Sequence, residues 1–435
     1  MRKKNRIAEK YWDIGLFLIL LIPLSVLLFV KCRYGYASRD EAFYLTIPYR
    51  LCQEDALLVN EWHLSQLISW VMQVPMRLYL QISGGGTEGI VLAFRQLYIA
   101  VHLCFAVLLF SLLRKYSRCG AVLAGLSFFV YAPFCISALS YNSLGIDCLT
   151  LAAALLCCGD SQWSGGFSGI LYALAVLCCP YLAVLFVLYG AAVLTLRLIK
   201  RAPDGCPYLR RYGWFVLGVA GTAGIFVLTV FPRIPLSAWN GMLETLLSDP
   251  EHQVGLLQSL GEYFRLVVCR GYVLGMIVIT AAACLVKKDW FRTLCTIAVL
   301  LATARSVYQS NPHINYLMST VGFCGFYFYA VYRNPEARRF FYGFWVPGML
   351  YTLCIHLGSN TGYLAISSAA TVPMVASVML IALSLKPLFH EKAAIGLRLG
   401  VAMSILLLVL VQGYWQVEER WNTSGIIPSR SRRSC

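Results

Sequence analysis

Long apolar segments recur from one end of this 435-residue chain to the other. A helix of about 20 apolar residues is long enough to cross the hydrocarbon core of a bilayer. Only 13% of the residues are charged, whereas an average soluble domain has about 25%. These features predict an all-α, polytopic integral membrane protein.

We expect thirteen membrane-spanning helices. They cover residues 14–31, 89–113, 119–139, 141–158, 166–180, 181–198, 214–231, 263–286, 291–309, 315–332, 341–357, 363–385 and 393–414. The first has no small-residue cleavage site after it, so we interpret it as a retained span and not as a signal peptide. The fifth and sixth meet at Pro180. We divide this continuous apolar run into two spans at Pro180. A single span would place residues 161–166 and the basic stretch 200–211 on opposite sides of the membrane.

The distribution of Lys and Arg predicts the orientation of the chain. Of the 36 basic residues, 22 lie in the N-terminal segment and in alternate loops that would share its side of the membrane. Cytoplasmic loops carry an excess of Lys and Arg. We therefore expect a multi-pass protein of the plasma membrane with a cytoplasmic N-terminus and, given an odd number of spans, an outer C-terminus.

The net charge of +16 does not indicate nucleic-acid binding, because the basic residues follow the positive-inside pattern. We see no Walker-type or GxGxxG loop, so ATP hydrolysis and nicotinamide chemistry are not expected. Most of the 17 cysteines lie in apolar runs, as in Cys157-Cys158 and Cys178-Cys179. Adjacent cysteines do not have the spacing of metal or CxxC sites, and buried thiols behave as small hydrophobes.

Two long outer loops are predicted, at residues 32–88 and 232–262. The first contains two helical patterns broken by Gly84-Gly85-Gly86, and the second has apolar residues at helical spacing from Trp239 to Leu247. Both loops suit amphipathic helices in the membrane interface. Residues 1–415 form one membrane domain on this interpretation, and residues 416–435 form a short, disordered outer tail.

The first outer loop begins with two adjacent carboxylates, Asp40 and Glu41, followed by Ala42-Phe43-Tyr44. Acidic residues close to lipid are rare unless they have a function. One interpretation is structural, because Asp caps helices well and Glu suits a first turn. The other is catalytic, and the two interpretations are compatible.

Other polar residues near the predicted outer face allow similar pairs of interpretations. Arg95, inside the second span, and Arg305, near the end of the ninth, either extend to the interface or bind a phosphate or carboxylate. Asp147, two turns into the fourth span, is expected to be hydrogen-bonded or paired with an arginine. Three further residues, His63, His313 and Tyr316, are interfacial aromatics or ligand-binding groups.

The order of these motifs resembles that of the GT-C glycosyltransferases, in particular the branch of protein mannosyltransferases and aminoarabinose transferases. The resemblance is carried by Asp40-Glu41-Ala42-Phe43-Tyr44, Glu61-Trp62-His63-Leu64-Ser65, Phe94-Arg95-Gln96-Leu97, Asp147-Cys148-Leu149 and Pro312-His313-Ile314-Asn315-Tyr316. It covers most of the chain. The chain lacks the family's prolines after His63 and a large outer C-terminal domain.

The resemblance implies an inverting transferase that moves a sugar from a polyprenyl-phosphate carrier to an acceptor on the outer face. Asp40 would be the general base and Glu41 would orient it or bind the acceptor. Arg95 and Arg305 would bind the leaving phosphate, and His63, Asp147, His313 and Tyr316 would line the sugar-phosphate pocket. No cofactor and no metal cluster are expected, although two carboxylates can hold a divalent metal weakly. The expected partners are the lipid-linked sugar donor, an acceptor of unknown kind and membrane lipid.

Two other classes of function remain open. A lipid or glycan transporter or flippase explains the spans and buried charges, and it predicts broken helices with charges near the bilayer midplane. A polysaccharide polymerase or ligase shares the outer-face chemistry but favours a large later loop rich in Arg and His. The loop 232–262 is only modestly charged.

Overall fold

The computed structural model describes residues 2–34, 39–60, 64–133, 136–198, 207–239, 255–268, 270–308, 316–358, 362–385 and 395–422. Within these ranges the chain folds into helices and turns, without a β-strand. The prediction of an all-helical protein is therefore confirmed for the part of the chain that is described.

The helices follow the predicted segments closely. In chain order they are α1 (Arg2–Lys31), α2 (Arg39–Cys52), η1 (Leu64–Ile68), α3 (Ser69–Ile82), α4 (Ile90–Leu113), α5 (Arg118–Val130), α6 (Tyr141–Cys158), α7 (Gln162–Cys178), α8 (Leu182–Leu198), α9 (Pro207–Val230), η3 (Phe231–Arg233), η4 (Leu236–Ala238), α11 (Leu256–Val267), α12 (Gly271–Leu285), α13 (Asp289–Tyr308), α14 (Tyr316–Tyr332), α15 (Pro335–Phe340), the π-helical turn η5 (Phe341–Trp345), α16 (Val346–Leu357), α17 (Tyr363–Ala369), α18 (Thr371–Leu385) and α19 (Ile395–Asn422). Twelve of the thirteen predicted spans coincide with one helix or with a consecutive set of helices. The third, predicted at 119–139, was drawn too long, because α5 ends at Val130.

Length and composition identify fewer spans than the sequence suggests. Five helical segments are long and apolar enough to cross a membrane, and the number rises to seven if two bent pairs each count as one span. The five segments are Tyr11–Lys31, Ile90–Leu113, Tyr141–Cys158, Arg211–Arg233 and Pro335–Leu357. Other apolar helices are shorter, at 10–17 residues. A membrane protein is supported, and thirteen crossings stay a prediction.

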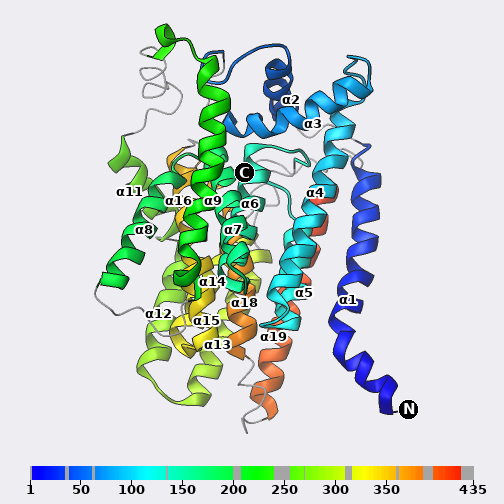
Figure 1. The fold of residues 1–435 in the computed structure, drawn as a ribbon. Helices are drawn as coiled ribbons and strands as arrows, with labels where there is room; N and C mark the ends of the chain where they lie inside the picture. Colours follow the sequence, from blue (N-terminus) through cyan, green and yellow to red (C-terminus); the bar gives the residue numbers. More distant parts are fainter. Residues whose placement is uncertain are drawn as a thin grey trace, which may run out of the picture.

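Helix α6 lies at the centre of the bundle. In its most apolar stretch 83% of the residues are buried, against 22% for the stretch in α9. Helix α1 stands at one side of the molecule (Figure 1). Apolar residues on it, such as Ile19 and Ile22, are 70% and 58% exposed. Large exposed apolar side chains along a long helix are typical of a lipid-facing surface.

The segment predicted as the first outer loop contains the two expected helices, α2 and α3, which lie beyond the upper ends of α1 and α6 (Figure 1). The division between them was predicted wrongly. The glycines follow α3 and connect it to α4, and Gly84 and Gly85 have positive φ angles of 63° and 89°. Glycine adopts this left-handed conformation without steric cost, so the run forms a turn after the second helix.

Other boundaries also differ from expectation. In the segment predicted as the second outer loop, residues 240–254 lie outside the described part, and the helix that follows, α11, begins at Leu256. Helix α19 continues to Asn422, beyond the predicted boundary at residue 415. Helices α17 and α18 form a pair bent by 48°.

Candidate functional site

The buried face of α4 holds three acid–base contacts at successive depths. From its upper end downward, Arg95 contacts Glu41 on α2, His102 contacts Asp147 on α6, and Arg114, just after the helix, contacts Asp13 on α1. Ionisable groups in apolar helices are costly unless they are paired. The three contacts therefore join α4 to three other helices.

The upper contact is a two-pronged ion pair. The Nε of Arg95 bonds to Oε1 of Glu41, and its Nη2 lies 2.6 Å from Oε2. The Nη1 donates to the carbonyl oxygen of Cys32 at 2.9 Å. Glu41 is 1% exposed and Arg95 is 8% exposed. Arg95 thus meets a carboxylate inside the protein, which is one of the alternatives left open by the sequence.

Asp40 has a different environment from its neighbour. It lies in the first turn of α2 and is exposed, whereas Glu41 is buried. Tyr44, one turn later, accepts a hydrogen bond at 3.2 Å from the side-chain amide of Asn142 on α6. Burial raises the pKa of Tyr44, and the negative charge of Asp40 adds to this effect. The ring of Tyr44 also meets the edge of Tyr141.

The local sequence fixes the start of α6 beside this group. Ser140 and Ser143 form a capping box, in which each side chain bonds to the backbone N–H of the other residue. A capping box satisfies two backbone donors that a helix start leaves open. It sets the position of Tyr141 and Asn142, the first two residues of the helix, opposite α2.

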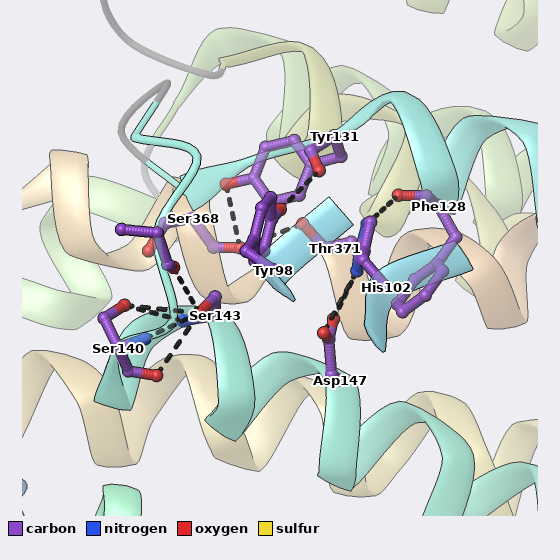
Figure 2. Close-up of polar contacts among 10 residues, drawn as sticks. Tyr98, His102, Phe128, Tyr131, Ser140, Ser143, Asp147, Ser368 and Thr371 are labelled. Atoms are coloured by element: carbon purple, nitrogen blue, oxygen red, sulfur yellow. Dashed lines mark hydrogen bonds and ion pairs between the residues drawn. The ribbon is translucent and has the colours of Figure 1, made fainter. Parts of the chain in front are cut away.

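The middle contact holds a histidine between two acceptors (Figure 2). The Nδ1 of His102 lies 2.9 Å from Oδ1 of Asp147, and its Nε2 lies 2.9 Å from the carbonyl oxygen of Phe128. A carbonyl oxygen only accepts, so Nε2 carries a proton. The other ring nitrogen, Nδ1, faces the carboxylate of Asp147, so the histidine bridges α6 and the end of α5. Both residues are buried, at 3% and 1% exposure.

Tyrosines extend this polar group toward α17. Tyr98 stacks on His102 and donates a hydrogen bond to the carbonyl oxygen of Tyr131 at 3.3 Å. Tyr131 in turn donates to the carbonyl oxygen of Ser368 at 3.3 Å (Figure 2). The bend between α17 and α18 therefore lies next to the polar contacts of α4.

The predicted site residues are only partly brought together. Glu41 joins Arg95, and Asp40 precedes Glu41 in the chain. Asp147 is hydrogen-bonded as expected, but its partner is a histidine and not an arginine. Arg305 is exposed near the end of α13 and, among the described residues, forms no ion pair. His63 and His313 lie outside the described residues, as does the side chain of Tyr316.

Several residues of this site were missed in the sequence. His102 carried a usable signal, because an ionisable residue within an apolar span is itself unusual. Tyr44 belonged to the motif that begins with Asp40, but no role was predicted for it. Asn142 carried no signal beyond its proximity to Asp147 in the chain. Within the described ranges, no group of three His, Cys, Asp or Glu side chains is arranged to hold a metal ion.

Comparisons with protein-family models, with curated proteins and with solved structures gave no match to this chain.

Proposed function

We propose that the protein is a membrane glycosyltransferase of the GT-C kind. It takes a sugar from a polyprenyl-phosphate carrier and transfers it to a hydroxyl group at the outer face of the plasma membrane. The observation that carries the proposal is the contrast between two adjacent carboxylates: Glu41 is buried against Arg95, and Asp40 is exposed. One acid fixes the helix, and the other is presented to a substrate.

In this proposal Asp40 takes the proton of the acceptor hydroxyl. The acceptor oxygen forms a bond to the anomeric carbon of the sugar while the bond from that carbon to the phosphate oxygen breaks. The polyprenyl phosphate leaves with the electron pair, and the configuration at the sugar is inverted. The negative charge of Asp40 also stabilises the positive charge that develops on the sugar.

The leaving phosphate requires a cation near the membrane surface. Arg95 and Arg305 are the candidates from the sequence. The three guanidinium nitrogens of Arg95 already bond to Glu41 and Cys32, so a phosphate would share this group with Glu41. Arg305 is exposed and has no ion pair with a described residue, which favours it for direct phosphate binding. Thirteen spans and two interfacial loops complete the proposed architecture.

A second candidate function is a lipid or glycan transporter. It is favoured by the His102–Asp147 pair, which is buried near the middle of α4, and by the 48° bend between α17 and α18. Buried ionisable groups and broken helices are features of transporters. In that case Asp40 would only begin α2.

The two functions are separated by one assay. The purified full chain is reconstituted in proteoliposomes with a panel of polyprenyl-phosphate sugars and a mixture of hydroxyl acceptors. Release of polyprenyl phosphate with sugar transfer supports the transferase. Movement of intact donor across the bilayer without cleavage supports the transporter and would overturn the proposed function.

A further inference from the structure

A cavity opens among the helices at the half of the bundle opposite Asp40. It is a partly open pocket and not an enclosed one, because the roughly 470 Å³ of space between its walls includes its open mouth. Its lining is almost entirely apolar and comes from α6, α7, α8, α9 and the run from η5 to α16. Ala153 on α6, Phe215 on α9 and Gly343 on η5 are among the lining residues.

Two arginines lie one helical turn from this lining. Arg211 precedes Phe215 by four residues on α9, and Arg339 precedes Gly343 by four residues on the run from α15 to η5. Four residues of α-helix rise about 6 Å. Both arginines belong to the segments whose basic residues predict the cytoplasmic side. The apolar cavity and the cations thus follow one another along the same helices.

The hydrogen bonds of both arginines converge on the end of α6. The Nη1 of Arg211 lies 3.3 Å from the carbonyl oxygen of Leu156 and 3.4 Å from Oγ of Ser164. The Nη1 of Arg339 bonds to the hydroxyl of Tyr116 and lies 3.5 Å from the carbonyl oxygen of Cys157. Cations at a helix C-terminus offset its partial negative charge, which is one role of these side chains.

Helix capping leaves most of this positive charge unbalanced. Each guanidinium makes its hydrogen bonds through a single nitrogen, and neither forms an ion pair with a carboxylate in the described part of the chain. The charge of Asp160 attracts both arginines, but its carboxylate oxygens accept hydrogen bonds from Lys115, at 2.8 and 2.9 Å. Arg211 is only 7% exposed. A buried charge without a counter-ion is costly, so the site favours an anion.

We propose that this site binds an anionic phospholipid of the cytoplasmic leaflet, with an acyl chain in the cavity and the phosphate at Arg211 and Arg339. Guanidinium groups bind phosphate through paired hydrogen bonds, and basic pockets between membrane helices recognise anionic headgroups. The adjoining apolar cavity favours a lipid over free phosphate. The proposal is independent of sugar transfer, because it concerns the opposite half of the bundle.

Native mass spectrometry of the full-length protein in detergent tests this proposal. Phosphatidylglycerol, phosphatidylcholine and inorganic phosphate are titrated separately, and the bound species are counted. Wild type should retain phosphatidylglycerol in preference to phosphatidylcholine. Arg211→Gln and Arg339→Gln should each weaken phosphatidylglycerol binding about tenfold or more, which is the usual effect of losing a charged hydrogen bond.

Two further variants separate the headgroup from the chain. Arg338→Gln removes an exposed arginine beside Arg339 and should leave binding unchanged. Ala153→Phe places a large side chain in the cavity and should weaken lipid binding while both arginines remain.

Equal retention of the two lipids, or equal loss in Arg338→Gln and Arg339→Gln, would overturn the proposal. Binding of inorganic phosphate as tight as that of the lipid would also overturn it, since the occupant would then be a free anion. If Arg211→Gln does not fold, Arg339→Gln and Ala153→Phe still decide the outcome.

Discussion

Glu41 and Arg95, which are 54 residues apart in the sequence, form a buried two-pronged ion pair between α2 and α4. The pair fixes α2 on the upper end of the bundle. Asp40 is thereby held in the first turn of α2 with its side chain exposed. The proposed base is therefore placed by a contact that its neighbour makes.

The first prediction concerns the stability of this pair. Glu41→Gln should lower the free energy of unfolding by about 3–5 kcal/mol, because it leaves the buried guanidinium without a counter-charge. Glu88→Gln, which alters an exposed carboxylate just before α4, should change it by less than about 0.5 kcal/mol. Denaturant unfolding in detergent measures both. The double variant Glu41→Leu with Arg95→Met should be more stable than Glu41→Gln, since it removes both charges together. Equal stability of Glu41→Gln and Glu88→Gln would mean that the pair does not hold α2.

A second prediction uses the close approach of α7 and α9. A methyl group added at Gly218 would overlap the carbonyl oxygen of Gly166, whereas one added at Gly221 meets nothing within 4 Å. Gly218→Ala should therefore destabilise the protein by about 1–3 kcal/mol. Gly221→Ala should be neutral or stabilise it by up to about 1 kcal/mol, because alanine favours a helix. Thermal unfolding of the two variants checks the expected order, and a reversed order would contradict the packing of these helices.

A third prediction concerns pH and the Lys115–Asp160 contact. Hydrogen bonds from Lys115 lower the pKa of Asp160 below its ordinary value of 3.8. A lowered pKa in the folded state means that the contribution to stability is present above pH 3.8 and is lost as the pH falls further. The Asp160 side chain is 88% exposed, so the contribution should be below about 1 kcal/mol. Asp160→Asn should be slightly less stable than wild type at pH 7, and the difference should disappear near pH 3. A difference that grows toward acid pH would contradict this assignment.

The fourth prediction is the orientation in the membrane. Cysteines are introduced by Asn60→Cys and Gly205→Cys in a cysteine-depleted background, and intact cells are treated with a membrane-impermeant thiol reagent. Label should reach position 60 and not position 205, because Lys and Arg predict that the loop 199–213 is cytoplasmic. Label at position 205 alone would reverse the orientation, including the leaflet proposed for the phospholipid.

The helical segments were predictable because their signals are local. Helix α6 spans Tyr141–Cys158, as predicted, since its start carries a capping box and its end is followed by Gly159 and Asp160. The turn at Gly84–Gly86 was placed wrongly because a glycine run marks a turn without saying which helices it connects.

Local sequence signals could not predict which ionisable residues of the site contact one another. Glu41 with Arg95 and His102 with Asp147 join positions 54 and 45 residues apart. Their contact depends on how α2, α4 and α6 pack, which neither residue type nor spacing specifies. The sequence therefore identified Arg95 and Asp147 as costly charges in apolar helices, but it did not identify the residues that balance them.

The rate of sugar transfer by the Asp40→Asn variant tests most directly the central claim that Asp40 is the general base. Asparagine keeps the shape of the side chain and can still begin a helix, but it cannot accept a proton. The measurement is the single-turnover rate of sugar release from a polyprenyl-phosphate donor that wild type consumes, with Glu88→Gln as the matched control. Asp40→Asn should fold normally and react about 100-fold more slowly or worse, while Glu88→Gln should match wild type. A rate for Asp40→Asn close to that of wild type would contradict the account, and Asp40 would then serve only to begin α2.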